Sequence, residues 1–466
     1  MKNFKNNKYK DILEFCTEEL STKIGYPGSL MSAIYGKVGQ DQVKVGDKEN
    51  KVIDNEVIGI LPGSLAELHI NNVGSPWKES ESYSVEVKNI EREVVEILGR
   101  YFGLNKNTSR GYVTSGGTES NIACMWWSSL WLCNKRIELL KKQIKEKENY
   151  IKQGLSAFKN STKDLLQYIE INKNIEDLTS PMVFCSKDHT HYSIKKISGL
   201  MKLDISFVNT YSDGQINLEH LEAKLIEHIT QRPNKGIMMI VNIGTTITGA
   251  IDNVREVRNI LDRCTNEGKI CPYTIHADAA CYGMIIPVTK PFGEVKDYFK
   301  DLGITTMTIS GHKFLGTNIL GIALTTKNFL DDSFIENSLI SYCGNIDDIT
   351  ISGCRSGLNV LWLHNTLLHL KLDSSTEIIE KIIQNNLVNA SYFYEKLVSI
   401  VGENNVFWNK NQFNIVFPMP TDRLIKKYKL MPATKDKVVA CTQIRVDKEL
   451  IDTFINEYKA DFQLYV

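Results

Sequence analysis

A lysine that follows a predicted strand is the residue of this sequence best placed for covalent chemistry. Lys313 ends the stretch Ser310-Gly311-His312-Lys313, directly after the β-branched run 305–310. The amine of a lysine forms a Schiff base with a carbonyl cofactor once its surroundings lower its pKa. The same position would also suit a solvated surface lysine, so the neighbouring motifs decide the interpretation.

An aspartate in an apolar run supplies that context. In His276-Ala277-Asp278-Ala279-Ala280, the period of a strand puts Asp278 on the same side as His276 and Ala280. Burying an unpaired carboxylate is costly, and a protonated pyridine nitrogen would be a suitable partner. A Schiff-base lysine with an aspartate at a pyridinium is the pattern of pyridoxal 5′-phosphate (PLP) sites. The alternative is a structural aspartate bonded to the backbone.

Three further loops carry groups that suit a phosphorylated ring. The segment 114–118 (Thr-Ser-Gly-Gly-Thr) precedes a Trp-rich apolar stretch. Glycines there let backbone amides approach an anion, and a helix N-terminus attracts phosphate. His191 follows another predicted strand and could stack on a ring, while Thr246 follows a fourth strand. Each signal is weak alone, but together they provide a phosphate cradle, a stacking ring, a partner for the pyridine nitrogen and a Schiff-base lysine.

Strands that alternate with helices would bring these loops to one edge of a sheet. We expect a helix over Asp252–Gly268, capped by Asp252 or Asn253. The expected strands are Met182–Ser186, Ile205–Thr210, Gly236–Gly244, Tyr273–Ala280, Thr305–Ser310 and Gly321–Thr326. This alternation predicts an α/β fold with a mainly parallel central sheet and helices on both faces. Such sheets bind ligands at the carboxyl ends of their strands.

The remaining segments suggest the domain organisation. We expect an N-terminal segment (1–70), a large domain (71–350) and a small C-terminal α+β domain (351–466). The small domain follows from a long helix and a strand–strand–helix pattern, over Leu372–Leu397, Phe413–Phe417, Val438–Arg445 and Lys448–Tyr458. The Lys- and Glu-rich stretch 134–177 is expected to form a charged helical hairpin, as a simple decoration or as a partner-docking arm.

Composition excludes few classes of protein. The chain has 466 residues with 55 basic and 55 acidic side chains, so no basic footprint for nucleic acid is present. Its ten cysteines form no Cys-x-x-Cys pair, and we expect neither a metal site nor a disulfide framework. No apolar run approaches the ~18 residues of a membrane span, and no signal-peptide pattern is visible. We therefore expect a cytoplasmic protein that contacts neither membrane nor nucleic acid.

In combination these motifs resemble the PLP-dependent group II amino-acid decarboxylases of fold type I, especially the histidine and serine decarboxylase branch. The matching stretches, from Gly25 to the C-terminus, are 25–27 (GYP), 70–76 (INNVGSP), 112–119 (YVTSGGTE), 188–193 (DHTHYS), 242–246 (NIGTT), 276–280 (HADAA), 310–313 (SGHK) and 350–357 (TISGCRSG). The stretch after 25–27, the segment 79–91 and the insertion 134–177 depart from the pattern of that branch.

The resemblance implies a role for each matching residue. Lys313 would hold PLP, Asp278 would pair with the pyridine nitrogen, and His191 and Ala280 would lie on the two ring faces. The other cofactor-binding residues would be Gly116, Gly117, Thr118, Thr246, Ser310 and His312, with the phosphate against Gly117, Thr118, Ser310 and His312. Such enzymes share active sites across a homodimer, so Ser352–Gly357 would reach the neighbour's phosphate.

The expected activity is decarboxylation of an L-amino acid, with histidine favoured over other aromatic amino acids or serine. Tyr342, one residue farther than expected from the Thr-Ile-Ser-Gly motif, would return a proton to the α-carbon. Three alternatives remain open. They are a carbon–carbon lyase of the sphingosine-phosphate type, an aminotransferase, and a catalytically silent binding partner. Retention of Lys313 and Asp278 argues against the last.

Overall fold

The structure is a computed structural model that describes residues 70–77, 86–153, 180–232, 235–269, 271–333, 339–340, 346–443 and 445–462. Within these ranges no helix is long and apolar enough to cross a membrane. The segments around Gly25 and Tyr342 that the sequence singled out lie outside them.

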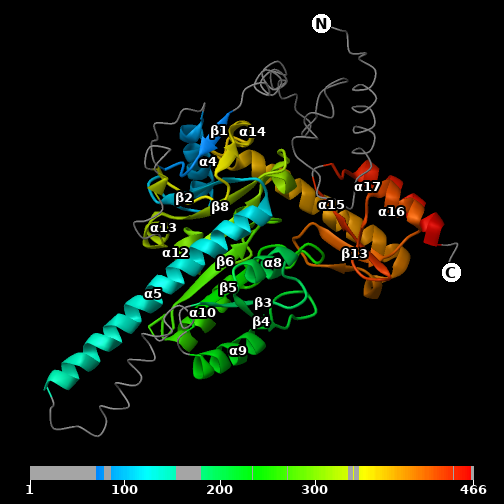
Figure 1. Cartoon of the computed structure of the whole chain (residues 1–466). Helices are drawn as coiled ribbons and strands as arrows, with labels where there is room; N and C mark the ends of the chain where they lie inside the picture. The colour runs from blue at the N-terminus through cyan, green and yellow to red at the C-terminus, as the bar shows by residue number, and fades with distance from the viewer. Residues whose placement is uncertain are drawn as a thin grey trace.

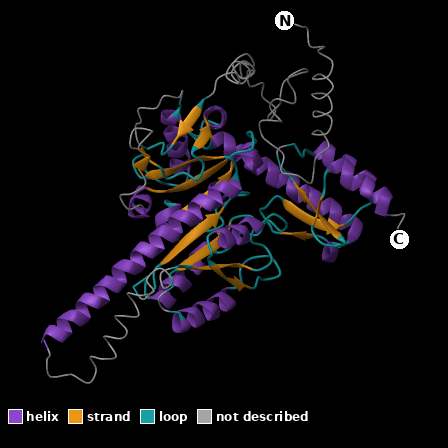
Figure 2. Cartoon of the chain, in the orientation of Figure 1, coloured by secondary structure: helices purple, strands orange, loops and turns teal. Residues whose placement is uncertain are grey.

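A seven-stranded sheet forms the centre of the chain (Figures 1 and 2). Its spatial order is β2-β8-β7-β6-β5-β3-β4. The strands are β2 (Ser109–Thr114), β3 (Met182–Ser186), β4 (Asp204–Val208), β5 (Ile237–Asn242), β6 (Tyr273–Asp278), β7 (Thr306–Ser310) and β8 (Gly321–Thr326). Strand β8 is antiparallel to both of its neighbours, while β7, β6, β5, β3 and β4 are parallel. The mainly parallel α/β fold expected from the sequence is therefore confirmed.

Helices cover both faces of this sheet, because its strands are apolar on both sides. Phe184 of β3 packs in the core that includes α4 (Lys88–Tyr101), α9 (Leu218–Gln231) and α10 (Val254–Thr265). Its neighbour Val183 faces the opposite core, beneath α5 (Gly117–Gln153) and α8 (Tyr192–Leu200). A strand buried on both faces is typical of parallel sheets.

The C-terminal part has its own antiparallel sheet and its own core. The strand order is β12-β13-β15-β14, with β12 at Phe407–Trp408, β13 at Asn414–Pro418, β14 at Met431–Pro432 and β15 at Lys437–Cys441. Helices α15 (Glu377–Val401), α16 (Asp422–Tyr428) and α17 (Lys448–Phe462) accompany it. Helix α15 joins the two parts, since Ile383 belongs to the large core and Ala390 to the small one.

Helix α5 is longer than the sequence suggested. It runs unbroken for 37 residues and projects from the body of the molecule (Figure 1). The Trp-rich stretch and the first half of the charged insertion are thus one element, with no break at Asn134. Leu132 and Arg136 are buried, so the insertion still packs against the body at its start. The second half of the expected hairpin lies outside the described residues.

Candidate active site

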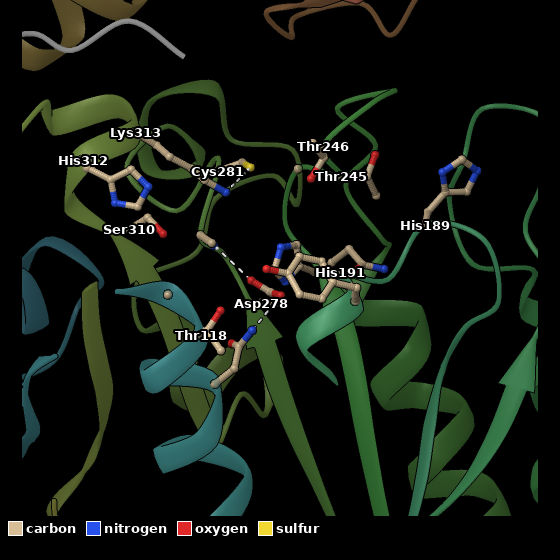
Figure 3. Close-up of a pocket in the computed structure, with 16 residues that line it drawn as sticks. Thr118, His189, His191, Thr245, Thr246, Asp278, Cys281, Ser310, His312 and Lys313 are labelled. Atoms are coloured by element: carbon tan, nitrogen blue, oxygen red, sulfur yellow. Dashed lines mark hydrogen bonds between the residues drawn. The ribbon is translucent and has the colours of Figure 1, made fainter. Parts of the chain in front are cut away.

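A cavity of about 320 Å³ lies at the carboxyl ends of β3, β5, β6 and β7. Figure 3 shows the side chains that converge on it. The lining residues are Gly117, Thr118, Asn121, His189, His191, Tyr192, Asn242, Gly244, Thr245, Thr246, Asp278, Ala280, Cys281, Ser310, His312 and Lys313. The alternation of strands and helices in the sequence predicted a ligand at this edge of the sheet.

Lys313 reaches the cavity from a single π-helical turn, Gly311–Leu315, that directly follows β7. Such turns are uncommon and occur often at functional sites. Gly316 ends the turn in the left-handed conformation, with φ of 70°. The Nζ of Lys313 donates to Cys281 Sγ at 3.0 Å, so the amine points across the cavity toward the loop after β6.

Asp278 ends β6 and is 6% exposed. Its Oδ2 accepts from Asn121 Nδ2 at 3.1 Å, and its Oδ1 accepts from the backbone N–H of Ala280 at 3.3 Å. Both donors are neutral, and a cationic ring nitrogen in the cavity would balance the buried charge. The carboxylate therefore fits the ring of PLP better than a purely structural role.

The loop before α5 fits a phosphate group. Gly117 begins α5, where backbone N–H groups without intrahelical partners favour an anion. A Cβ atom at Gly117 would stand 2.7 Å from Ser310 Oγ, so only glycine leaves the two loops this close. Glu119 accepts from Ser115 N at 2.8 Å, and this hydrogen bond stabilises the loop. His312 packs nearby with its Nδ1 3.3 Å from Leu320 O, and burial lowers its pKa.

His191 is the N-cap of α8. Its Nδ1 lies 2.7 Å from Ser193 Oγ and accepts the Ser193 backbone N–H at 3.3 Å. Burial lowers the pKa of His191, which favours a neutral imidazole. Burial also lowers the pKa of His189, another lining residue of the same loop. A neutral ring fixed at the start of a helix suits stacking on a cofactor.

A hydrogen-bonded group behind the cavity supports this loop. Asp252 is fully buried and accepts from Ile216 N and Asn242 N, both at 2.7 Å, and from Asn242 Nδ2. Asn242 Nδ2 also donates to Ser186 Oγ, which contacts Thr190 Oγ1 at 2.9 Å. Burial raises the pKa of Asp252 to about 6. The helix cap is therefore Asn253, which accepts from Glu256 N, and not Asp252.

Almost all residues proposed from the sequence come together at this cavity. Gly116 lies next to the lining residue Gly117 and does not itself line it. Thr246 sits at the rim, where its carbonyl accepts from Asn414 Nδ2 at 2.8 Å. Asn121 and Cys281 contact the key groups and were not proposed. Asn121 stands three residues after Thr118 in the same motif, and this spacing was the available signal.

The segment Ser352–Gly357 lies apart from the cavity, and Arg355 and Gly357 are its buried residues. Arg355 forms a buried ion pair with Glu91, and its Nη2 donates to Gly74 O at 2.8 Å. Ile351, Gly353, Cys354 and Ser356 are exposed around it. Arg355 therefore fixes the segment to the rest of the chain, and the residues on either side of it are exposed.

Known proteins similar to this chain are consistent with this geometry. Residues 154–335 match the pyridoxal-dependent decarboxylase conserved domain. Histidine decarboxylase of Morganella morganii is 29% identical over 400 residues, 85% of this chain and 87% of that protein. Histidine decarboxylase of Pseudomonas entomophila is 28% identical over 410 residues, 86% of this chain and 84% of that protein. L-Methionine decarboxylase of Streptomyces sp. 590 has a similar fold, with a TM-score of 0.71, 16% identity and coverage of 98% and 96%.

Proposed function

We propose that this chain is a group II PLP-dependent amino-acid decarboxylase and that its substrate is L-histidine. The single observation that carries the chemistry is the convergence of Lys313, Asp278 and His191 on one cavity. The preference for histidine rests on relatives named histidine decarboxylase that align over most of the chain. The fold alone does not select it, since a methionine decarboxylase shares that fold.

The residues that line the cavity would have distinct roles in binding PLP. Lys313 would attach the cofactor, and Gly117, Thr118, Ser310 and His312 would hold its phosphate. Asp278 would hold a proton at the pyridine nitrogen, and His191 and Ala280 would face the ring. Bound PLP supplies the electron sink for the pair left behind when the carboxylate departs as carbon dioxide. Tyr342, which lies outside the described residues, would give the proton of its Oη to the substrate α-carbon, because a phenol with a reference pKa of about 10 is protonated at neutral pH.

We further propose a homodimer in which a second chain covers this cavity. Ile319, 73% exposed, lies beside Gly116, with its Cγ2 3.9 Å from where a Cβ on that glycine would stand. Ile351 is also exposed, at the start of the outward-facing segment Ser352–Gly357. The proposal rests on the resemblance to enzymes that share active sites across a homodimer, in which a second copy would bring its Ser352–Gly357 to the phosphate and would cover Ile319 and Ile351.

The test of the function is the release of carbon dioxide from a panel of L-amino acids by the PLP-loaded enzyme. We expect histidine to give the highest kcat/KM, above aromatic amino acids, serine and methionine, with Lys313→Ala inactive. A higher kcat/KM for another amino acid of the panel would refute the proposal that histidine is the substrate. An aldehyde formed by carbon–carbon cleavage without carbon dioxide would indicate a lyase, and transfer to a keto acid an aminotransferase. No turnover at all would support a silent protein.

The test of the dimer is sedimentation of Ile319→Glu beside the matched control Ile226→Glu. Ile226 is also exposed but lies on α9, on another side of the molecule (Figure 1). We expect Ile319→Glu alone to dissociate the chain and reduce activity. A wild-type monomer with full activity would refute the shared site.

A further inference from the structure

One buried amide connects the two side chains that face the cofactor. Asn121, in the second turn of α5, is 1% exposed. Its Nδ2 donates to Asp278 Oδ2 at 3.1 Å and to Ser193 Oγ at 3.0 Å, while its Oδ1 lies 3.1 Å from His276 Nε2. The opposite orientation of the amide would place its oxygen against the Asp278 carboxylate, which excludes it on electrostatic grounds.

This orientation fixes the proton of His276. Because Asn121 Oδ1 is an acceptor, His276 must carry its proton on Nε2. Its Nδ1 then accepts from Thr306 Oγ1, 2.9 Å away. Burial lowers the pKa of His276 to about 4, so the ring is neutral near neutral pH. A neutral ring can donate from Nε2 and accept at Nδ1 at the same time.

The other end of the network fixes the proton of His191. Ser193 Oγ accepts from Asn121, so its own hydroxyl proton is free to donate to His191 Nδ1, 2.7 Å away. The backbone N–H of Ser193 also donates to this nitrogen at 3.3 Å. Two donors on Nδ1 leave the proton of the neutral ring on Nε2.

We propose that Asn121 is a positioning residue that sets both cofactor-facing groups, orienting the Asp278 carboxylate and, through Ser193, holding His191 as the neutral Nε2–H tautomer. The charged groups that act on His191 oppose one another, because Asp278 raises its pKa whereas Lys313 and Lys196 lower it. These effects, with burial the largest, determine the charge of the ring. The directed hydrogen bonds at Nδ1 determine the tautomer of the neutral ring. The proposal rests on the proposed function only in that Asp278 and His191 face PLP.

The decisive measurement is the tautomer of His191, observed by side-chain ¹H–¹⁵N correlation spectra of the cofactor-free and PLP-loaded enzyme at neutral pH. The chain has nine histidines, and His191→Gln identifies the signal. We expect an unprotonated Nδ1 in the wild type and a mixture of tautomers in Ser193→Ala. The matched control is Ser198→Ala on the same helix, because Ser198 is equally buried and its Oγ contacts no partner within the described ranges. A protonated Nδ1 in the wild type, or an unchanged tautomer in Ser193→Ala, would overturn the proposal.

Kinetics gives a second, independent readout. Asn121→Ala removes a hydrogen bond to a charged group, so kcat should fall roughly 10- to 150-fold with little change in KM. Ser193→Ala removes a neutral bond and should lower kcat about 2- to 10-fold. If Asn121→Ala changes kcat no more than Ser198→Ala, the positioning role is wrong. If Asn121→Ala does not fold, Thr306→Val tests the same group of hydrogen bonds. Asn121 Oδ1 should still hold the His276 proton on Nε2 after the donor to Nδ1 is lost, and a shift of that ring to the Nδ1–H tautomer would contradict the orienting role of Asn121. A wild-type enzyme that shows the expected tautomers but no decarboxylation would refute the proposed function alone.

Discussion

Replacing Arg355 by methionine should destabilise the folded protein strongly. Glu91 is fully buried and the Arg355 side chain is 4% exposed, so the change leaves a carboxylate without its cation. Glu91 would keep two neutral donors, Asn72 Nδ2 at 2.8 Å and Val113 N at 2.9 Å. Breaking a buried pair on one side costs about 3–5 kcal/mol. The free energy of unfolding should fall by that amount.

The assay is urea unfolding of the PLP-loaded enzyme at one fixed protein concentration. The control is Arg423→Met, because Arg423 pairs with Glu457 at 3.2 Å on the surface, where ion pairs contribute little. The double variant Glu91→Gln/Arg355→Met removes the buried charge and should be more stable than Arg355→Met alone. A loss below about 1 kcal/mol for Arg355→Met, or a double variant less stable than the single, would refute the reasoning, because the buried charge would then not be the cause.

Four further predictions concern the site and its surroundings. Asp278→Asn should reduce kcat and kcat/KM together while PLP absorbance shows retained cofactor, because the electron sink matters mainly in the transition state; unchanged turnover would contradict the role of Asp278. Burial lowers the pKa of His276 from 6.5 to about 4, so the unfolded chain binds a proton at this ring more readily than the folded chain between these pH values. The free energy of unfolding should therefore fall by about 3 kcal/mol from this group as pH falls from 6.5 to 4. The raised pKa of Asp252 acts with the opposite sign between 3.8 and about 6, and His276→Gln should lose less stability than the wild type between pH 6.5 and 4, measured by thermal unfolding against pH. Trimming the insertion between Lys142 and 177 should leave turnover intact, whereas trimming from Asn134 removes the buried Arg136 and should lower the melting temperature. Tyr342→Phe should keep carbon dioxide release but lower the ratio of amine to carbon dioxide, and a ratio near one with normal turnover would pass the proton to another donor.

The central strands could be predicted because each is a short β-branched run bounded by turn residues. All six expected strands are present, and their ends differ by two residues at most. Lys313, Asp278 and His191 were found for a related reason, since each follows or ends such a run and the carboxyl ends of parallel strands share one edge.

What the sequence did not reveal depends on contacts between distant positions. Asn121 and Asp278 are 157 residues apart, and Glu91 and Arg355 are 264 apart. No local pattern encodes such pairs. The predicted start of the helical hairpin at Asn134 was wrong for a different reason. Composition changes near Asn134 from aromatic to charged residues, but Lys, Glu and Leu are good helix formers, so helix α5 continues across the change.

The unbroken helix α5 has a consequence for how this chain can diverge. At 1.5 Å per residue its 37 residues span about 55 Å, with the cavity-lining Gly117 at one end and Gln153 at the other. Adding or removing turns at the distal end changes the length of the arm but leaves every hydrogen bond of the first turns in place. Arm length and the geometry around Thr118 and Asn121 can therefore change independently of one another.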